Sequence, residues 1–300
     1  MASEETNPTP DAPAPSAFVV GGGPVATALA GALRVAGVTV HGLWARRQEQ
    51  AQLAAARAGV TGYAGPVPPV IGDAQVIIVA VRDSAIETVA AQLLDTSTIG
   101  EDQILVHCSG AMPAQLAFGS AAERVAGVGT LHPLRAIADG RAAIELLPET
   151  VFGVEGTEAG RTGARALAMA MGARCLELEA DQMAAYHAAA SMASNFLVAV
   201  LDSAAAVLAE AGIEGESALS ALVPLAQGSL ANVKDKGIVR GLTGPIKRGD
   251  LPTVARHLDA LSHTAQATYR ALGLVTLDIA RRGNAATAAD LDAIEELLRS

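Results

Sequence analysis

The 300 residues of this chain are enough for two domains of ordinary size, and a content of 51% apolar residues is typical of folded cores. A formal net charge of −10, with no basic cluster interleaved with aromatic residues, argues against nucleic-acid binding. The two cysteines, Cys108 and Cys175, form neither a CxxC motif nor a Cys/His pair at metal-ligand spacing. Neither a disulfide framework nor a metal site is therefore predicted.

The first 15 residues read MASEETNPTPDAPAP. They carry acidic residues and prolines where a secretory signal has basic residues and an apolar run. This composition is typical of a disordered tail. We therefore expect a cytoplasmic protein with a disordered segment over residues 1–15.

Apolar stretches of strand type alternate with helical patterns from residue 16 to residue 179. The run QVIIVAV is rich in β-branched residues, as is typical of strands buried on both faces of a parallel sheet. Strands that alternate with helices predict an α/β fold, here a doubly wound, mostly parallel Rossmann-type sheet over 16–179. The expected strands lie at 17–20, 38–47, 75–81, 103–110, 124–134, 150–156 and 174–179.

The strand pattern stops there, and residues 180–300 are expected to form an all-α C-terminal domain. One long helix is predicted over 182–211 and another over 216–233. Residues 234–250 are polar and punctuated by glycine and proline, so we expect a loop, followed by a helix that Asp250 caps.

The long helix over 182–211 is not expected to cross a membrane, because His187, Asn195 and Asp202 are costly in hydrocarbon. Its small side chains suit close helix packing, which fits a homodimer formed through the helical domain. The same side chains also suit packing within one chain, and the sequence does not separate the two.

A glycine-rich turn lies between the first strand and the first helix, in the segment VVGGGPVATALA. Its Gly21-x-Gly23-x-x-Ala26 spacing is typical of a dinucleotide site, because the first glycine permits a tight turn and the second lets the backbone approach a pyrophosphate. The helix that begins with Pro24 and Val25 offers its unpaired N–H groups to phosphates. A plain strand-to-helix connection is the alternative.

Two arginines, Arg46 and Arg47, follow the second strand, where sites that prefer NAD usually have an acidic residue. A guanidinium at this position suits the 2′-phosphate of NADP by its charge and its planar donors. The sequence therefore favours NADP(H) as the cofactor over NAD(H). The alternative is that both arginines are solvated residues at the start of a helix.

Several segments spread over both predicted domains resemble one family. They are the glycine turn, LWARR, VAVRDSAI, HCSGAMPAQL, GTLHPLRAIAD, YHAAASMASNFL and LTGPIKRGDLPTVARHL. Through them the chain resembles a family of NADP-dependent oxidoreductases that join a Rossmann-like domain to a helical domain of unknown function. Its N-terminal half also resembles the superfamily of 6-phosphogluconate, 3-hydroxyacid and prephenate dehydrogenases and ketopantoate reductase.

The resemblance implies roles for residues along the predicted sheet edge. Arg46 would contact the 2′-phosphate, and Val81 and Arg82 would lie beside the nicotinamide ribose or the adenosine. Prephenate dehydrogenases have a functional histidine in an His-Pro step, which falls here on His132. Ser109, at the end of its strand, is expected to line the nicotinamide region.

A stripe of polar residues interrupts the alanine-rich helix, because His187, Ser191 and Asn195 recur at intervals of four. Hydroxyacid dehydrogenases and ketopantoate reductase carry Lys-x-x-x-Asn on the corresponding helix, and the matching positions here are Ser191 and Asn195. Since this helix has no lysine, we expect His187 or His132 to exchange the proton. The alternative is that these polar residues only pack against their neighbours.

The sequence thus predicts an NADP(H)-dependent oxidoreductase that transfers hydride to or from a small carbonyl or hydroxyl substrate, in a cleft between the domains. The catalytic candidates are His187, Asn195, His132 and Ser191. The alternative is a non-catalytic NADP(H)-binding sensor or scaffold, which the missing lysine favours.

Overall fold

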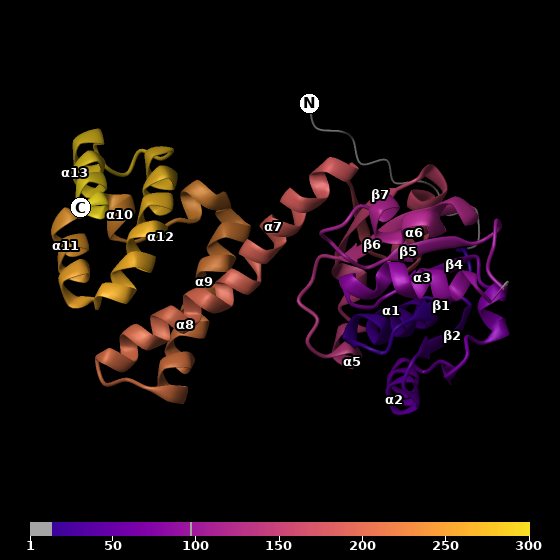
Figure 1. Cartoon of the computed structure of the whole chain (residues 1–300). Helices are drawn as coiled ribbons and strands as arrows, with labels where there is room; N and C mark the ends of the chain where they lie inside the picture. The colour runs from indigo at the N-terminus through magenta and orange to yellow at the C-terminus, as the bar shows by residue number, and fades with distance from the viewer. Residues whose placement is uncertain (1–13, 97) are drawn as a thin grey trace. The chain divides into compact units, whose positions relative to one another are not determined.

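The computed structural model describes residues 14–96 and 98–300. The predicted tail therefore lies almost entirely outside the described residues. The chain divides into two compact units, Met1–Ser191 and Met192–Ser300. Figure 1 shows the first unit as a sheet with helices and the second as helices.

An eight-stranded sheet forms the centre of the first unit, with the strand order β3-β2-β1-β4-β5-β6-β7-β8. All neighbouring strands are parallel except β6 and β7, which are antiparallel. This confirms the predicted doubly wound, mostly parallel fold class, although the short β3 was not expected from the sequence. The strands are β1 (Ala17–Val20), β2 (Val40–Ala45), β3 (Gly62–Ala64), β4 (Val76–Val79), β5 (Ile104–His107), β6 (Gly127–Pro133), β7 (Val151–Gly156) and β8 (Arg174–Glu177).

Helices cover both faces of this sheet (Figure 1). The core on one face includes α1, α2, α5 and α6, and the core on the other face includes α3 and α4. The helices of the first unit are α1 (Pro24–Val35), α2 (Gln48–Ala58), α3 (Ile86–Leu94), α4 (Ala114–Phe118), α5 (Gly140–Ala143) and α6 (Glu158–Ala170). To these is added α7 (Met183–Ala193), which crosses the boundary between the units.

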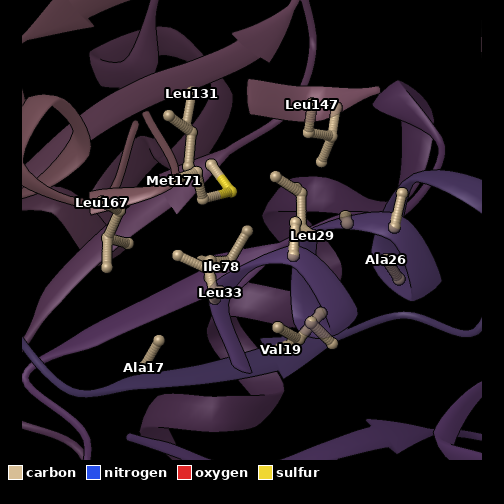
Figure 2. Packing of buried hydrophobic residues seen from close by; sticks show 14 of the residues in the cluster. Ala17, Val19, Ala26, Leu29, Leu33, Ile78, Leu131, Leu147, Leu167 and Met171 are labelled. Atoms are coloured by element: carbon tan, nitrogen blue, oxygen red, sulfur yellow. The ribbon is translucent and has the colours of Figure 1, made fainter. Parts of the chain in front are cut away.

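Strand β1 shows why the central strands are apolar throughout. Ala17 and Val19 belong to the core on the α1 face, whereas Phe18 and Val20 belong to the core on the α3 face. Successive side chains of a strand point to opposite faces, so a strand covered on both faces must be apolar at every position. Figure 2 shows the first of these cores, where Leu29 and Leu33 of α1 pack near Ile78 of β4.

The second unit consists of helices around a smaller core from α10, α11, α12 and α13. Asp250 caps α11 by accepting a hydrogen bond from the Thr253 N–H, as predicted. The helices are α8 (Asn195–Glu210), α9 (Gly215–Gly241), α10 (Pro245–Arg248), α11 (Leu251–Ala260), α12 (His263–Arg281) and α13 (Ala288–Arg299).

Two helix boundaries differ from the prediction. The helix expected over 182–211 is interrupted at Ser194, whose φ of −119° and ψ of −74° depart from helical geometry. The prediction of a loop over 234–250 is wrong in its first half, because α9 continues to Gly241. Within α9 the backbone at Gly237 is non-helical, with a φ of 73° and a ψ of 170°, so α9 consists of two helices joined across a kink at this glycine.

The stretch Ala180–Glu210 is long and apolar enough to cross a membrane by length and composition alone. None of its most apolar window is buried in the structure. The prediction that it does not enter a membrane rests on His187, Asn195 and Asp202.

Candidate functional site

The strand register defines one edge of the sheet as a candidate site. Val20, Val79, His107 and Thr130 form one row across β1, β4, β5 and β6. These four strands are parallel, so the residues that follow the row gather at a single carboxyl edge, where α/β sheets bind their ligands. The segments after Val20, Val79 and His107 include Gly21, Arg82 and Ser109, and His132 lies two residues beyond Thr130.

The glycine turn after β1 contains two glycines, Gly21 and Gly23, whose surroundings differ. Gly21 has a φ of 137°, and a Cβ there would lie 2.2 Å from the Ala80 carbonyl oxygen, so the fold itself demands glycine. Gly23 has an ordinary φ of −85°, and a Cβ there would meet nothing within 4 Å. No neighbour in the described part of the chain therefore requires a glycine at position 23, and the open backbone there leaves room for a ligand.

Helix α1 begins at this turn with Gly23 as N-cap and Pro24 as its first residue. Among the described residues, no side chain caps it. The first-turn N–H groups, including that of Val25, therefore point out of the helix toward the turn, where they suit an anion. A cavity of about 130 Å³ adjoins the turn and is lined by Gly23, Arg57 and Asp139, among others. These features fit a pyrophosphate.

Arg46 and Arg47 follow β2 directly, and both side chains are exposed. Arg47 is the N-cap residue of α2, and its Nη2 donates a hydrogen bond to Gln50 Oε1 at 3.4 Å. Arg46 is the residue immediately beyond the last residue of β2.

The segment after β4 is tied to the segment after β5. Val81 is half-buried and Arg82 is exposed, and Asp83 begins a short 3₁₀ turn that precedes α3. Asp83 does not cap α3, whose N-cap residue is Ala85. Instead the Asp83 Oδ2 accepts a hydrogen bond of 2.8 Å from the hydroxyl of Ser109, which is buried. This contact fixes two segments of the carboxyl edge to each other.

His107 and Glu155 form a buried hydrogen-bonded chain behind that edge. His107 Nδ1 accepts from the Ser109 N–H at 3.1 Å, and its Nε2 lies 3.3 Å from Thr130 Oγ1. Thr130 in turn donates to Glu155 Oε2 at 3.2 Å, and Glu155 also accepts the Ala114 N–H. Burial lowers the pKa of His107 to about 4, with Asp83 acting in the opposite direction. A neutral His107 with its proton on Nε2 satisfies every one of these contacts.

Two of the predicted catalytic histidines meet at Gly110. The rings of His132 and His187 have centroids 5.8 Å apart. A Cβ at Gly110 would lie 2.7 Å from His187 Nδ1 and 2.9 Å from His132 Nε2. The structure therefore brings together a residue that follows β5, one near the end of β6 and one of α7, all within the first unit.

His132 is held in a neutral state by its surroundings. Burial lowers its pKa to about 4, and His187 acts in the same direction while Asp83 opposes it. On the other side of its ring, Nδ1 lies 2.8 Å from the hydroxyl of Tyr186. Burial raises the pKa of Tyr186 to about 12, so this hydroxyl also keeps its proton at neutral pH.

The remaining residues of the predicted stripe lie differently. Within the described part of the chain, the buried Nδ1 of His187 has no hydrogen-bond partner. Ser191 is half-buried, one turn further along α7. Asn195 is exposed and belongs to the second unit, and the irregular residue Ser194 breaks the helical spacing before it. The four-residue spacing alone therefore does not place Asn195 beside His187.

Sequence reasoning missed several residues of this cluster. Tyr186 precedes His187 and reads as an ordinary aromatic residue on an apolar helix, and Gly110 reads as part of a turn. Glu155 had a detectable signal, because a lone carboxylate in the strand TVFGVEG is an exception in an apolar run. Among the described residues, no group of three or more His, Cys, Asp or Glu side chains could hold a metal ion.

Comparison with known proteins gives two family models along the chain. A model of a Rossmann-like domain matches residues 1–134, and a model of a domain of unknown function (DUF2520) matches residues 150–276. Together the two models match most of the chain, the Rossmann-like domain first and DUF2520 second. The Rossmann-plus-DUF2520 pairing agrees with the family resemblance read from the sequence. No curated protein matches the chain.

Solved structures of similar fold cover most of this chain. Protein TM1727 from Thermotoga maritima is 25% identical, with a TM-score of 0.69 over 88% of this chain and 99% of its own. BF3122 from Bacteroides fragilis, assigned as an NADP oxidoreductase, is 22% identical with a TM-score of 0.69 over 90% and 99%. An NADH-preferring ketol-acid reductoisomerase from an uncultured archaeon is 17% identical with a TM-score of 0.62 over 94% and 82%.

Proposed function

We propose that this protein is an NADP(H)-dependent oxidoreductase that transfers hydride to or from a small carbonyl or hydroxyl compound. The observation that carries the proposal is the shared carboxyl edge. One end of that edge has a glycine turn whose Gly23 no neighbouring residue requires, and the other end has two histidines against Gly110. The fold neighbours include reductases, which supports the same reaction class.

The residues that would bind the cofactor begin at the glycine turn. The backbone at Gly21 and Gly23 and the first turn of α1 would hold the pyrophosphate. Arg46, with Arg47 beside it, would hold the 2′-phosphate by charge-assisted hydrogen bonds. Val81, Arg82 and Ser109 follow β4 and β5 and would line the nicotinamide half, which supplies or accepts the hydride.

His132 is the better candidate for proton exchange with the substrate oxygen. Its ring is oriented by Tyr186, and its Nε2 edge lies against Gly110. His187 Nδ1 lies against the same glycine and has no hydrogen-bond partner among the described residues, so no neighbouring side chain orients this ring as Tyr186 orients His132. We assign His187 to the wall of the substrate site, with Ser191 further along α7.

A panel of small aldehydes and ketones, with NADPH consumption as the readout, tests the reaction. We expect at least one member to be reduced, and we expect the rate to collapse in His132→Asn while NADPH affinity stays. Tight NADPH binding with no turnover across the panel would favour the alternative, a nucleotide-binding sensor or scaffold. That alternative is supported by the missing lysine on α7.

A further inference from the structure

Tyr186 of α7 and His132 of β6 form a hydrogen-bonded pair. The Tyr186 hydroxyl lies 2.8 Å from His132 Nδ1, and the two rings meet edge to face with centroids 5.5 Å apart. A second contact fixes the tyrosine, because a Cβ at Gly153 would lie 2.6 Å from its hydroxyl oxygen. Gly153 is the β7 residue directly opposite His132 in the sheet. The sheet therefore seats the hydroxyl beside the imidazole.

The proton of this hydroxyl has one suitable acceptor. Burial keeps the Tyr186 hydroxyl protonated at neutral pH, so this O–H can donate to His132 Nδ1, which lies 2.8 Å from its oxygen. A neutral imidazole that accepts at Nδ1 carries its proton on Nε2. That nitrogen is on the edge of the ring that faces Gly110.

We propose that Tyr186 is a positioning residue that directs the His132 Nε2–H toward the substrate site and replaces that proton as it is used. This inference rests on the proposed function. During reduction, the His132 Nε2–H bond breaks as the substrate oxygen gains its proton. At the same time the Tyr186 O–H bond breaks and a new Nδ1–H bond forms, so His132 stays neutral throughout. The starting state returns when Nδ1 gives its proton back to the tyrosinate and Nε2 takes a proton from solvent.

This relay avoids the formation of an imidazolate at His132. A neutral imidazole that simply loses its Nε2 proton becomes an imidazolate, which is too basic to form at neutral pH. The groups that face His132 are Tyr186 and His187 of α7, His107 of β5 and Asp83 after β4. Of these, Tyr186 alone has a hydroxyl within hydrogen-bond distance of His132 Nδ1, at 2.8 Å.

The chain contains a matched control pair. His257 and Tyr269, in the second unit, have the same Nδ1-to-hydroxyl distance of 2.8 Å and rings at 89°. Tyr269→Phe therefore removes a similar hydrogen bond within the second unit. A loss of function that is confined to Tyr186→Phe cannot be explained by the loss of one tyrosine hydroxyl in general.

The first measurement needs no substrate: the ¹⁵N resonances of His132 in wild type, Tyr186→Phe and Tyr269→Phe labelled at histidine. At pH 7 we expect His132 to be protonated on Nε2 and to accept at Nδ1 in the wild type and in Tyr269→Phe. In Tyr186→Phe we expect a mixture of tautomers. A wild-type His132 with its proton on Nδ1 overturns the proposal. This result is independent of whether NADPH binds or any carbonyl compound is reduced, so it can fail separately from the proposed function.

The second measurement is the pH profile of NADPH-dependent reduction of whichever panel compound reacts. We expect Tyr186→Phe to lower turnover about 100-fold at pH 7, at the low end of what general acid catalysis contributes. Without the relay, His132 must donate as an imidazolium, so the residual rate should rise as the pH falls toward 5. Wild type and Tyr269→Phe should lack this rise. Equal rates and equal pH profiles in all three proteins overturn the relay.

Discussion

The two ends of the carboxyl edge are built in different ways. The cofactor end is a backbone feature, contained in the dozen residues around Gly21 and Gly23, and its geometry follows from strand, turn and helix. The histidine end is built from side chains of β5, β6, β7 and α7, which are brought together only by the sheet order. A backbone site can therefore be recognised in one short segment of sequence, whereas a side-chain site of this kind cannot.

The largest expected effect is at the histidine end. His132→Asn should lower turnover by about 10²- to 10⁴-fold, which is the usual contribution of a general acid. Since His132 lies away from the glycine turn, NADPH affinity should stay within about twofold of wild type. Parallel steady-state kinetics and NADPH titration check this, and unchanged turnover would remove His132 from the chemistry.

The two glycines of the turn allow structure and ligand binding to be separated. Gly21→Ala should destabilise the protein by about 3 kcal/mol or more, because it adds a Cβ at a positive φ and against the Ala80 carbonyl. Gly23→Ala should change stability by only about 0.5 kcal/mol, since its Cβ meets nothing within 4 Å, yet it should weaken NADPH binding at least about tenfold. Denaturant unfolding and calorimetry measure the two quantities. A Gly23→Ala protein that binds NADPH like wild type would contradict a pyrophosphate at this position.

Stability should fall with acid because His107 is buried in its neutral form. Its pKa is about 4 in the folded protein against an ordinary value of 6.5, so the unfolded chain binds more protons between these values. The contribution is full above pH 6.5 and is lost as the pH falls toward 4, by about 3 kcal/mol at pH 4. His132, whose pKa is also about 4, adds a loss of the same sign, so His107→Gln should remove about half of the dependence in urea unfolding, whereas the exposed His263→Gln should leave it unchanged. A similar slope in both variants would contradict a neutral His107.

The smallest effect concerns the choice of cofactor. Arg46→Ala should weaken NADPH binding by about 10- to 100-fold and leave NADH binding nearly unchanged, because a charge-assisted hydrogen bond contributes about 1.5–3 kcal/mol. Arg174→Ala is the control, since Arg174 is an exposed arginine on β8, at the edge of the sheet. Equal losses of NADPH affinity in Arg46→Ala and Arg174→Ala would show that the effect of Arg46 comes only from its contribution to the net charge.

Much of the fold was predictable because its signals are local. The β-branched run of β4, the glycine turn and the Asp250 cap each occupy a few residues, and the structure confirms them. Predictions failed where a single residue has two possible effects. Gly237 divides α9 into two helices joined by a kink where a longer loop was expected, and Ser194 interrupts a helix whose composition shows no break.

The candidate site was only partly predictable, because its contacts span long sequence separations. His132 and His187 could be proposed as separate candidates, but nothing local indicates that both rings pack against Gly110. Tyr186 is 54 residues from His132, and Asp83 is 26 residues from Ser109. These pairs depend on the order of β4, β5, β6 and β7 in the sheet, which a single sequence does not fix.

The central claim is that the carboxyl edge binds NADP(H), and the most direct test is a calorimetric titration of the full-length protein with NADPH and, in parallel, NADH. We expect one NADPH bound per chain with micromolar affinity and NADH bound at least about tenfold more weakly. If neither nucleotide binds, the glycine turn is only a connection between β1 and α1, and the oxidoreductase proposal is contradicted while the fold remains.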